Sequence, residues 1–173
     1  MAVRPDSKIV VGGSIKQGEP RKFALVRYLS NGTLDLSFDG DGFVTAQFDP
    51  GALSDEEIKA IAIRSDGKIA AVGDYKSGQF ALARYNLDGS LDTVFGSDGR
   101  VTVSSKVSTG YGVGWQADGS VVAAGSKSVI DQASANCVDS SGKHCEYKDF
   151  WLARFNGHGT LDKVSTGIER MHF

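Results

Sequence analysis

The stretch Phe80-Ala-Leu-Ala-Arg-Tyr-Asn-Leu-Asp-Gly-Ser-Leu-Asp92 decides the fold, because the chain contains two further near-copies of it. The first copy is Phe23-Ala-Leu-Val-Arg-Tyr-Leu-Ser-Asn-Gly-Thr-Leu-Asp35, and the third is Phe150-Trp-Leu-Ala-Arg-Phe-Asn-Gly-His-Gly-Thr-Leu-Asp162. Repetition of a long unit along one chain is the signature of a repeat architecture, in which each copy forms the same supersecondary unit. The sequence therefore predicts three structural units of one kind.

The middle copy predicts four short strands. Glu57-Ile-Lys-Ala-Ile-Ala-Ile-Arg64 alternates with period two, and Ser65-Asp-Gly67 is a hairpin turn that leads into a second strand at 68–75. A third strand covers 79–86, and a long turn precedes a fourth strand at 100–104. Four antiparallel strands with small or apolar residues on both faces describe a sheet packed between two copies of itself. This is the blade of a β-propeller.

The same pattern excludes two other architectures. A β-sandwich needs one solvated face on each sheet, and a helical solenoid does not show period-two alternation. We therefore predict an all-β chain with a single propeller-repeat domain over residues 1–173. Its three four-stranded antiparallel blades lie at about 1–49, 55–105 and 109–173, the last with an insertion at 129–148.

Both ends of the repeat array depart from the middle copy. Ala2-Val-Arg-Pro-Asp6 matches only the end of a first strand. After Asp162 the expected turn is replaced by the different sequence of residues 163–173. This tail is compatible with an outer strand, with a premature end and with a shifted reading frame, and the residues alone do not separate these alternatives.

The wording of the copies resembles that of a known repeat family. Asp66-Gly-Lys-Ile69 precedes the quoted stretch, and Phe95-Gly-Ser-Asp-Gly99 follows it, as Phe38-Asp-Gly-Asp-Gly42 does in the first copy. Together these residues resemble the delta-60 repeats of bacterial β-propeller-like proteins. The resemblance implies a propeller fold and little about activity, because such repeats occur mostly in long proteins of unassigned function. It also implies an extracellular or surface location for the parent family.

The number of blades bears on the assembly. Complete propellers have four to eight blades, so three blades leave two sheet faces and their edges exposed. One expectation is a homodimer in which two half-rings close a six-bladed propeller, since two-fold dimers are the commonest closed oligomers. The other is an unstable fragment of a longer protein.

The composition narrows the range of partners. The chain has a formal net charge of −2 and no cluster of Lys and Arg, which argues against nucleic acid as a partner. No apolar run approaches the roughly 18 residues that a membrane span needs, so no membrane partner is expected. The sequence Met1-Ala-Val-Arg-Pro-Asp6 lacks the apolar core of a secretory signal, which predicts a cytoplasmic protein.

Acidic residues gather where the blade model places one rim of the central channel. They are Asp49, Asp55, Glu56, Glu57 and Asp74, with Glu19 nearby in sequence. Converging carboxylates at a channel mouth suit Ca²⁺ or another divalent cation. Ca²⁺ takes six to eight oxygen ligands. We take Asp55, Glu57 and Asp74 as the candidate metal ligands. The alternative is that they are ordinary solvated loop residues.

The insertion at 129–148 lies on the same rim and contains Cys137, His144 and Cys145. Loops that grow out of a regular scaffold are common places for binding and catalysis. The two cysteines fit either a disulfide or two free thiols, and a Cys-His-Cys metal site lacks a fourth ligand. His144 and Glu57 are the candidate catalytic residues, as groups that could activate water.

Other residues recur or deviate between the copies. Tyr111 and Trp115 interrupt the small residues of the innermost strand of the third copy, so they either line the channel and contact a small-molecule ligand or fill space. The recurring charged residues are Arg27, Arg84 and Arg154 with Asp35, Asp92 and Asp162. A residue that occurs once per blade is expected to be structural: the Asp caps the long turn, and the Arg bridges to carboxylates or turn carbonyls of a neighbouring blade.

Two functions follow as hypotheses. The first is a scaffold or binding module that self-associates to close the ring, with a ligand or cation site at the channel mouth. The second is a metal-dependent hydrolase of the esterase, lactonase or phosphotriesterase type, by analogy with six-bladed propellers that hold Ca²⁺ in the channel. This analogy rests on fold alone. The sequence has no Gly-x-Ser-x-Gly elbow, so a serine hydrolase is unsupported.

Overall fold

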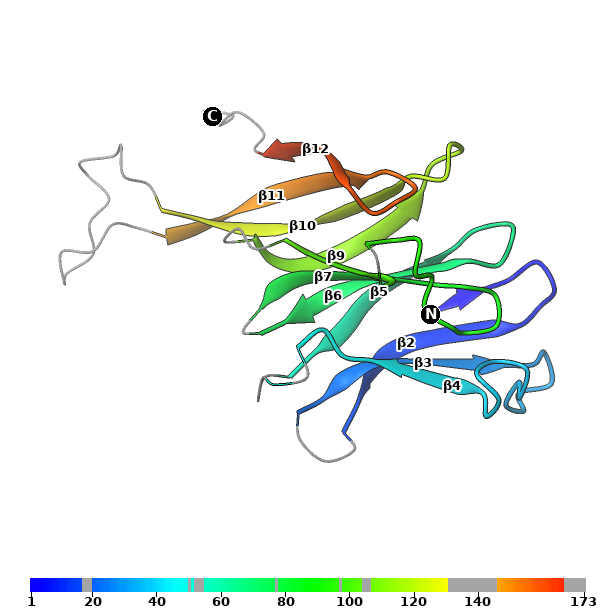
Figure 1. Ribbon diagram of the computed structural model, residues 1–173. Coiled ribbons are helices and arrows are strands. Elements are labelled where there is room, and N and C mark those ends of the chain that lie inside the picture. The colour runs from blue at the N-terminus through cyan, green and yellow to red at the C-terminus, as the bar shows by residue number, and fades with distance from the viewer. Residues whose placement is uncertain are drawn as a thin grey trace.

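The computed structural model describes residues 1–16, 20–49, 51, 55–76, 78–96, 98–103, 107–130 and 146–166. These residues form three separate four-stranded antiparallel sheets and contain no helix. Figure 1 shows the sheets as successive layers, with the first copy at the bottom, the second in the middle and the third at the top. The predicted all-β fold of three four-stranded blades is confirmed.

Each blade takes its four strands in chain order. Blade 1 consists of β1 (Ala2–Val3), β2 (Ile9–Ile15), β3 (Lys22–Tyr28) and β4 (Phe43–Ala46). Blade 2 consists of β5 (Glu57–Ile63), β6 (Ile69–Tyr75), β7 (Gln79–Tyr85) and β8 (Arg100–Val103). Blade 3 consists of β9 (Val107–Trp115), β10 (Val121–Ile130), β11 (Glu146–Phe155) and β12 (Leu161–Thr166).

The repeated stretch forms the third strand of each blade, and its register against the second strand is the same in all three. The equivalent pairs are Ile9↔Tyr28, Ile69↔Tyr85 and Val121↔Phe155. Because side chains alternate between the two faces of a strand, one register places the same repeat positions on the same face of every blade. The blades can therefore be compared position by position.

Blade 3 differs from the other two at the place of the predicted insertion. Its strands β10 and β11 have 10 residues each, and they continue to pair through Ser128↔Lys148 and Val129↔Tyr147 to Ile130↔Glu146. Part of the insertion is thus an extension of the hairpin, which projects past the other blades in Figure 1. The outer strand β12 lies against β11, so residues 161–166 take the outer-strand role considered from the sequence.

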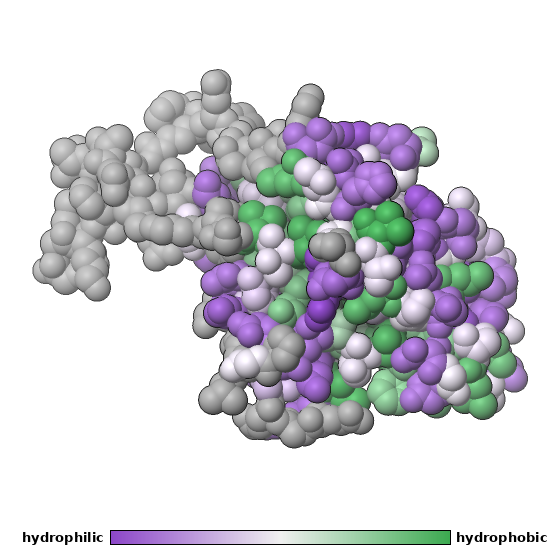
Figure 2. Space-filling view, viewed as in Figure 1, coloured by the Kyte–Doolittle hydropathy of each residue, from purple (hydrophilic) through white to green (hydrophobic). Residues whose placement is uncertain are grey.

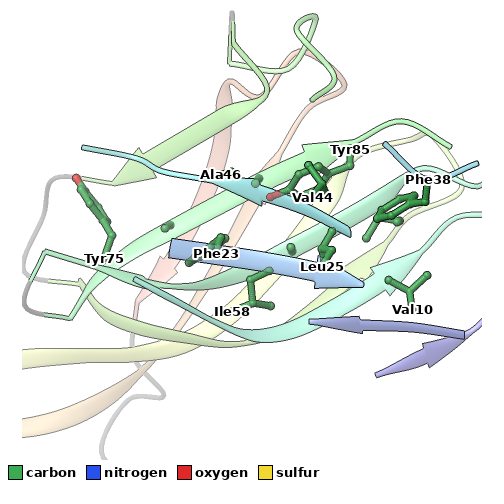
Figure 3. Close-up of a cluster of buried hydrophobic side chains, with 13 residues drawn as sticks. Val10, Phe23, Leu25, Phe38, Val44, Ala46, Ile58, Tyr75 and Tyr85 are labelled. Carbon is green, nitrogen blue, oxygen red and sulfur yellow. The ribbon is translucent and has the colours of Figure 1, made fainter. Parts of the chain in front are cut away.

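Two hydrophobic layers hold the three sheets together. The layer between blades 1 and 2 includes Phe23 and Leu25 of β3 and Tyr85 of β7, and Figure 3 shows these side chains converging from neighbouring sheets. The layer between blades 2 and 3 includes Phe80 of β7 and Trp151 of β11. Blade 2 therefore contributes both faces of β7 to the core. This explains why the third strand is apolar on both sides.

The second layer is built around the Phe80 ring, which is tilted against the Trp151 ring and parallel to the Phe155 ring. The Phe80 ring lies 4.7 Å from that of Trp151 and 5.8 Å from that of Phe155, measured between centroids. A Cβ atom on Gly110 would lie 2.3 Å from a methyl group of Val72 and 2.9 Å from the Phe80 ring. Glycine at this position of β9 therefore allows the close approach of the two blades. Full burial of each such large side chain contributes about 1.5–3 kcal/mol.

The innermost strand is full length in blade 2 and very short in blade 1. A Cβ atom on Gly73 would lie 1.9 Å from the Glu57 carbonyl oxygen of β5, whereas one on the equivalent Gly13 would meet nothing within 4 Å. This difference follows from β1, which pairs only Ala2 and Val3 with β2. The clipped first strand expected from the sequence is present as a two-residue strand.

The described residues include no helix long and apolar enough to cross a membrane. In the view of Figure 2, hydrophobic residues reach the surface in several separate patches with hydrophilic residues between them.

Candidate functional site

The recurring Arg and Asp residues are structural in blades 1 and 2. Arg27 Nε donates to Asp35 Oδ2 at 2.7 Å, and Arg84 Nε donates to Asp92 Oδ2 at 2.9 Å. Each guanidinium also lies over the phenylalanine ring of its own long turn, 4.5 Å from the centroid of Phe38 for Arg27 and 4.4 Å from that of the equivalent ring for Arg84. All four charged residues are at most 5 % exposed. The structural role expected for these two pairs is confirmed.

The same turns link each blade to the next one. Arg27 Nη1 donates to the Leu87 carbonyl oxygen of blade 2. Beside this contact the Asp39 amide donates to the Asp88 carbonyl oxygen at 2.7 Å, and the equivalent bond in the next join runs from the Gly96 amide to the His158 carbonyl oxygen at 2.9 Å. A hydrogen bond from a charged donor contributes about 1.5–3 kcal/mol. Arg27 therefore joins blade 1 to blade 2 in addition to pairing with Asp35 of its own turn.

The buried aspartates remain ionised because cations surround them. Lys8 Nζ lies 2.8 Å from Asp35 Oδ2, and Lys68 Nζ occupies the equivalent position by Asp92 at 2.5 Å. Burial alone would raise the pKa of Asp35, but hydrogen bonds from Lys8 and Ser37, together with the charge of Arg27, hold the pKa of this carboxyl well below its ordinary value of 3.8. Burial is likewise outweighed at Asp92, whose pKa is lowered by Lys68 and Arg84.

The third arginine has a different environment, because no blade follows blade 3 in the described chain. Arg154 Nε donates to Gln116 Oε1 at 2.6 Å, and its other nitrogens pair with Asp118 and Asp162. Its side chain is 31 % exposed, against 3 % for that of Arg27. The side-chain nitrogens of Arg154 thus have partners within its own blade, and part of the side chain remains exposed.

The structure brings two of the three candidate metal ligands together. Glu57 and Asp74 are opposite each other on β5 and β6, and Lys59 Nζ lies 2.6 Å from Glu57 Oε2 and 3.7 Å from Asp74 Oδ1. The hydrogen bond to Glu57 raises the pKa of Lys59, and burial raises the pKa of Asp74. An ammonium group therefore takes the position between these carboxylates that a bound cation would need.

The other rim carboxylates are paired separately. The Arg21 amide donates to Asp55 Oδ1 at 2.9 Å, and the Arg21 guanidinium lies 3.8 Å from Asp55. Asp49 forms an ion pair with Lys76 at 3.1 Å. Over the described residues, no group of three or more His, Cys, Asp or Glu side chains is placed to hold a metal ion. Ca²⁺ needs six to eight oxygens, so the cation site stays a prediction from the sequence.

Glu56 has a role that sequence reasoning missed. It was expected among the rim carboxylates, yet it is 2 % exposed, and its Oε1 accepts hydrogen bonds from the amides of Phe48 at 2.9 Å and Asp49 at 3.3 Å. Glu56, which precedes the first strand of blade 2, therefore binds the backbone amides just after the outer strand of blade 1. Burial raises the pKa of Glu56. Nothing in the sequence distinguishes Glu56 from the exposed acids beside it.

The two deviant aromatic residues of β9 lie in different surroundings. Trp115 Nε1 donates to the Ala62 carbonyl oxygen at 3.1 Å, and the Arg64 guanidinium lies 4.9 Å from the Trp115 ring centroid, so Trp115 joins blade 3 to blade 2. Tyr111 is 60 % exposed. It lines an open cavity of about 210 Å³ together with Gly125, Ser126, Lys148, Asp149 and Phe150. Of the two candidate ligand-binding residues, Tyr111 lines this cavity, and Trp115 packs against blade 2.

Several sequence candidates lie outside the described residues. They are Glu19, Cys137, His144 and Cys145. The catalytic roles considered for His144 and Glu57 and the state of the two cysteines therefore remain predictions.

The most distinctive surfaces of the described chain are the open faces of its two outer blades. On each third strand, alternate positions form a leading face and a receiving face. The leading face carries Phe, Leu and Arg in all three blades, and the receiving face carries small residues and an aromatic in blades 1 and 2 but Trp151, Ala153 and Phe155 in blade 3. Phe23 and Leu25 are 0 % exposed against blade 2, whereas their equivalents Phe150 and Leu152 are 73 % and 46 % exposed. Blade 3 thus presents an open leading face.

Blade 1 presents the opposite kind of surface. Its receiving face is formed by Val11 of β2 with Ala24, Val26 and Tyr28 of β3. Val11 is 37 % exposed, Val26 and Tyr28 are half-buried, and Ala24 is 8 % exposed. The equivalent residues of blade 2 are 0 % exposed against blade 1; they are Ala71, Ala81, Ala83 and Tyr85. The two ends of the chain therefore carry unlike faces, and faces of these two kinds meet in both joins inside the chain.

Comparison with protein families agrees with this architecture. The sequence model of a family described as "Domain of unknown function (DUF5122) beta-propeller" matches residues 4–38 and 64–95. The two matched ranges are equivalent, because each runs from the turn before the second strand to the phenylalanine of the long turn. The chain is thus similar to a β-propeller repeat family. The search of curated proteins finds no match.

Proposed function

We propose that the chain is a β-propeller scaffold and binding module that associates with a second copy to close a six-bladed ring. The observation that carries this proposal is the pair of unlike open faces on blades 1 and 3. Each has the pattern of a face that is fully buried elsewhere in the chain. Six blades lie within the range of four to eight that closed propellers have.

The apolar residues on these faces supply the driving force. Phe150 and Leu152 are 73 % and 46 % exposed, and Val11 is 37 % exposed on the other face. Full burial of a side chain of this size contributes about 1.5–3 kcal/mol, and a closed two-chain ring contains each face twice. A closed ring also covers the exposed sheet faces, which would otherwise invite aggregation.

In the proposed ring, the inner rims of the two copies share one axis. The cluster of Glu57, Lys59 and Asp74, with Tyr111 close enough to make a small contribution to the raised pKa of Lys59, would be present twice around the channel. A mouth with paired acidic and basic groups and an exposed phenol suits a small polar ligand. The scaffold would then bind such a ligand between its two copies.

Sedimentation equilibrium tests the assembly directly. We expect a mass of about twice the 18.3 kDa of one chain at concentrations of about 1–50 µM, with dissociation on dilution toward the Kd. A single chain at the highest concentration would overturn the proposal. A mass that rises above that of two chains as the concentration increases would also overturn it. Open association of unlike faces produces polymers, whereas a closed ring stops at two chains.

A further inference from the structure

The contacts at the two joins inside the chain specify how a third join would be made. In the first join, the leading face of blade 1 buries Phe23 and Leu25 in a cluster with Ala81, Ala83 and Tyr85 of blade 2. In the second, the leading face of blade 2 buries its phenylalanine and leucine in a cluster with the receiving face of blade 3. Both joins are therefore made between unlike faces in the same order.

We propose that each seam of the ring joins the leading face of blade 3 in one copy to the receiving face of blade 1 in the other, and that Arg154 crosses this seam to the Ser30 carbonyl oxygen of the partner copy. This inference rests on the proposed function and names the residues through which the copies recognise each other. The apolar part of the seam is then a third example of a join that the chain already contains twice, and its arginine contact follows the join of blades 1 and 2.

The apolar part of the seam follows from the first join. Phe150 occupies the position of Phe23, and Ala24 and Tyr28 of the partner copy occupy the positions of Ala81 and Tyr85. Ala24, like Ala81, leaves room for the phenylalanine ring, whereas the equivalent residue of blade 3 is a tryptophan. The seam therefore resembles the join of blades 1 and 2 more closely than that of blades 2 and 3.

The arginine provides the polar part. Arg27 reaches the carbonyl oxygen of Leu87, which is the third residue after Arg84. The third residue after Arg27 is Ser30, so its carbonyl oxygen occupies the equivalent place on blade 1. Arg154 has the exposed edge that this contact requires, since 31 % of its side chain is accessible, against 6 % for Arg84.

A seam between like faces does not have these contacts. Two leading faces would bring two Arg154 side chains together, and like charges repel. Two receiving faces would leave both copies of Phe150 exposed. Only the unlike pairing covers both open faces in a closed ring of two chains.

Complementation between two face variants tests the pairing. Phe150→Asp disables the leading face, and Val11→Asp disables the receiving face. Both side chains are exposed, so far-UV circular dichroism and melting should show intact folds. The control is Val94→Asp, because Val94 is 61 % exposed although its blade is flanked on both sides.

We expect each face variant alone to be a single chain at concentrations where the wild-type protein and the Val94→Asp control form dimers. Mixing the two face variants should restore a species of two chains, because one intact seam remains between them and no further chain can add. Arg154→Met should weaken the dimer at least about tenfold, since it removes a charged hydrogen bond from each seam.

Three results would overturn the pairing while leaving the proposed function intact. These are a dimeric Val11→Asp variant, a mixture that stays monomeric at all concentrations, and an Arg154→Met dimer as tight as the wild type. A monomeric wild-type protein would instead overturn the proposed ring itself. The two failures are therefore distinguishable in one series of sedimentation measurements.

Discussion

Replacing the phenylalanine at one repeat position in different blades shows how much burial, at constant residue type, contributes to stability. Phe80 and Phe150 are equivalent residues of β7 and β11, but Phe80 is 0 % exposed and Phe150 is 73 % exposed. We compare Phe80→Ala with Phe150→Ala. Phe23→Ala serves as a second buried member of the set, because Phe23 is also 0 % exposed.

The magnitudes follow from these environments. Replacing a buried phenylalanine by alanine costs about 3–5 kcal/mol, including the cavity that is left. Phe80 should lie at the upper end, because it loses ring contacts at 4.7 Å and 5.8 Å, each worth about 0.5–1.5 kcal/mol beyond area burial. Only about a quarter of Phe150 is covered within the chain, so Phe150→Ala should cost less than about 1 kcal/mol in the single chain.

Urea titrations followed by far-UV circular dichroism measure these differences in the free energy of unfolding. They should be made at a concentration at which sedimentation shows a single chain. The reasoning fails if Phe150→Ala costs as much as Phe80→Ala under these conditions, or if Phe80→Ala costs less than about 1 kcal/mol. At concentrations that favour the ring, the cost of Phe150→Ala should rise toward that of Phe23→Ala.

Three further predictions use contacts within the chain. The free energy of unfolding should fall as the pH drops below the ordinary aspartate pKa of 3.8, because the lowered pKa of Asp35 stabilises the fold only while the carboxyl is ionised. In urea titrations at several pH values, Asp35→Asn should make the free energy of unfolding less dependent on pH. An unchanged dependence would contradict this role of the Asp35 carboxylate. Gly73→Ala should lower the melting temperature strongly, because its Cβ would meet a backbone oxygen at 1.9 Å, and Gly13→Ala should leave it nearly unchanged; equal effects would refute this reading of the innermost strand. Lys59→Met should lower the melting temperature, because the two carboxylates beside Lys59 lose their ammonium group. Addition of about millimolar Ca²⁺ should then raise the melting temperature of this variant. A Ca²⁺-dependent rise in the wild-type protein would show that Lys59 does not take the place of a cation.

Much of the fold could be predicted because each blade follows period-two alternation and marked turns. The repeated stretch gave the third strand of every blade, and the turn at Ser65-Asp-Gly67 gave the hairpin before β6. The extension of β10 and β11 was not foreseen. Lys127, Ser128 and Lys148 are polar residues in a paired ribbon that reaches beyond the neighbouring blades, so no buried face marks them as strand residues.

The candidate site was harder to predict than the fold, because acidic residues close in sequence have different partners. Glu57 and Lys59 are two residues apart on β5, but the register of β5 against β6 shifts between Ile58 and Ala60, so strict alternation does not by itself account for their ion pair. The burial of Glu56 depends on how blade 2 meets the end of blade 1, which no local pattern encodes. The open faces became visible only when exposure was compared between equivalent blades.

Because blade 2 alone among the described blades is covered on both sides, protection against hydrogen exchange should be uneven along the chain. In a repeat protein, stability is close to a sum of the contributions of each unit and of its contacts with its neighbours. Amides of β6 and β7 should therefore exchange most slowly, at a rate set by global unfolding, while the outer blades open through smaller local fluctuations. Closure of the ring would remove this gradient, because every blade would then have two neighbours.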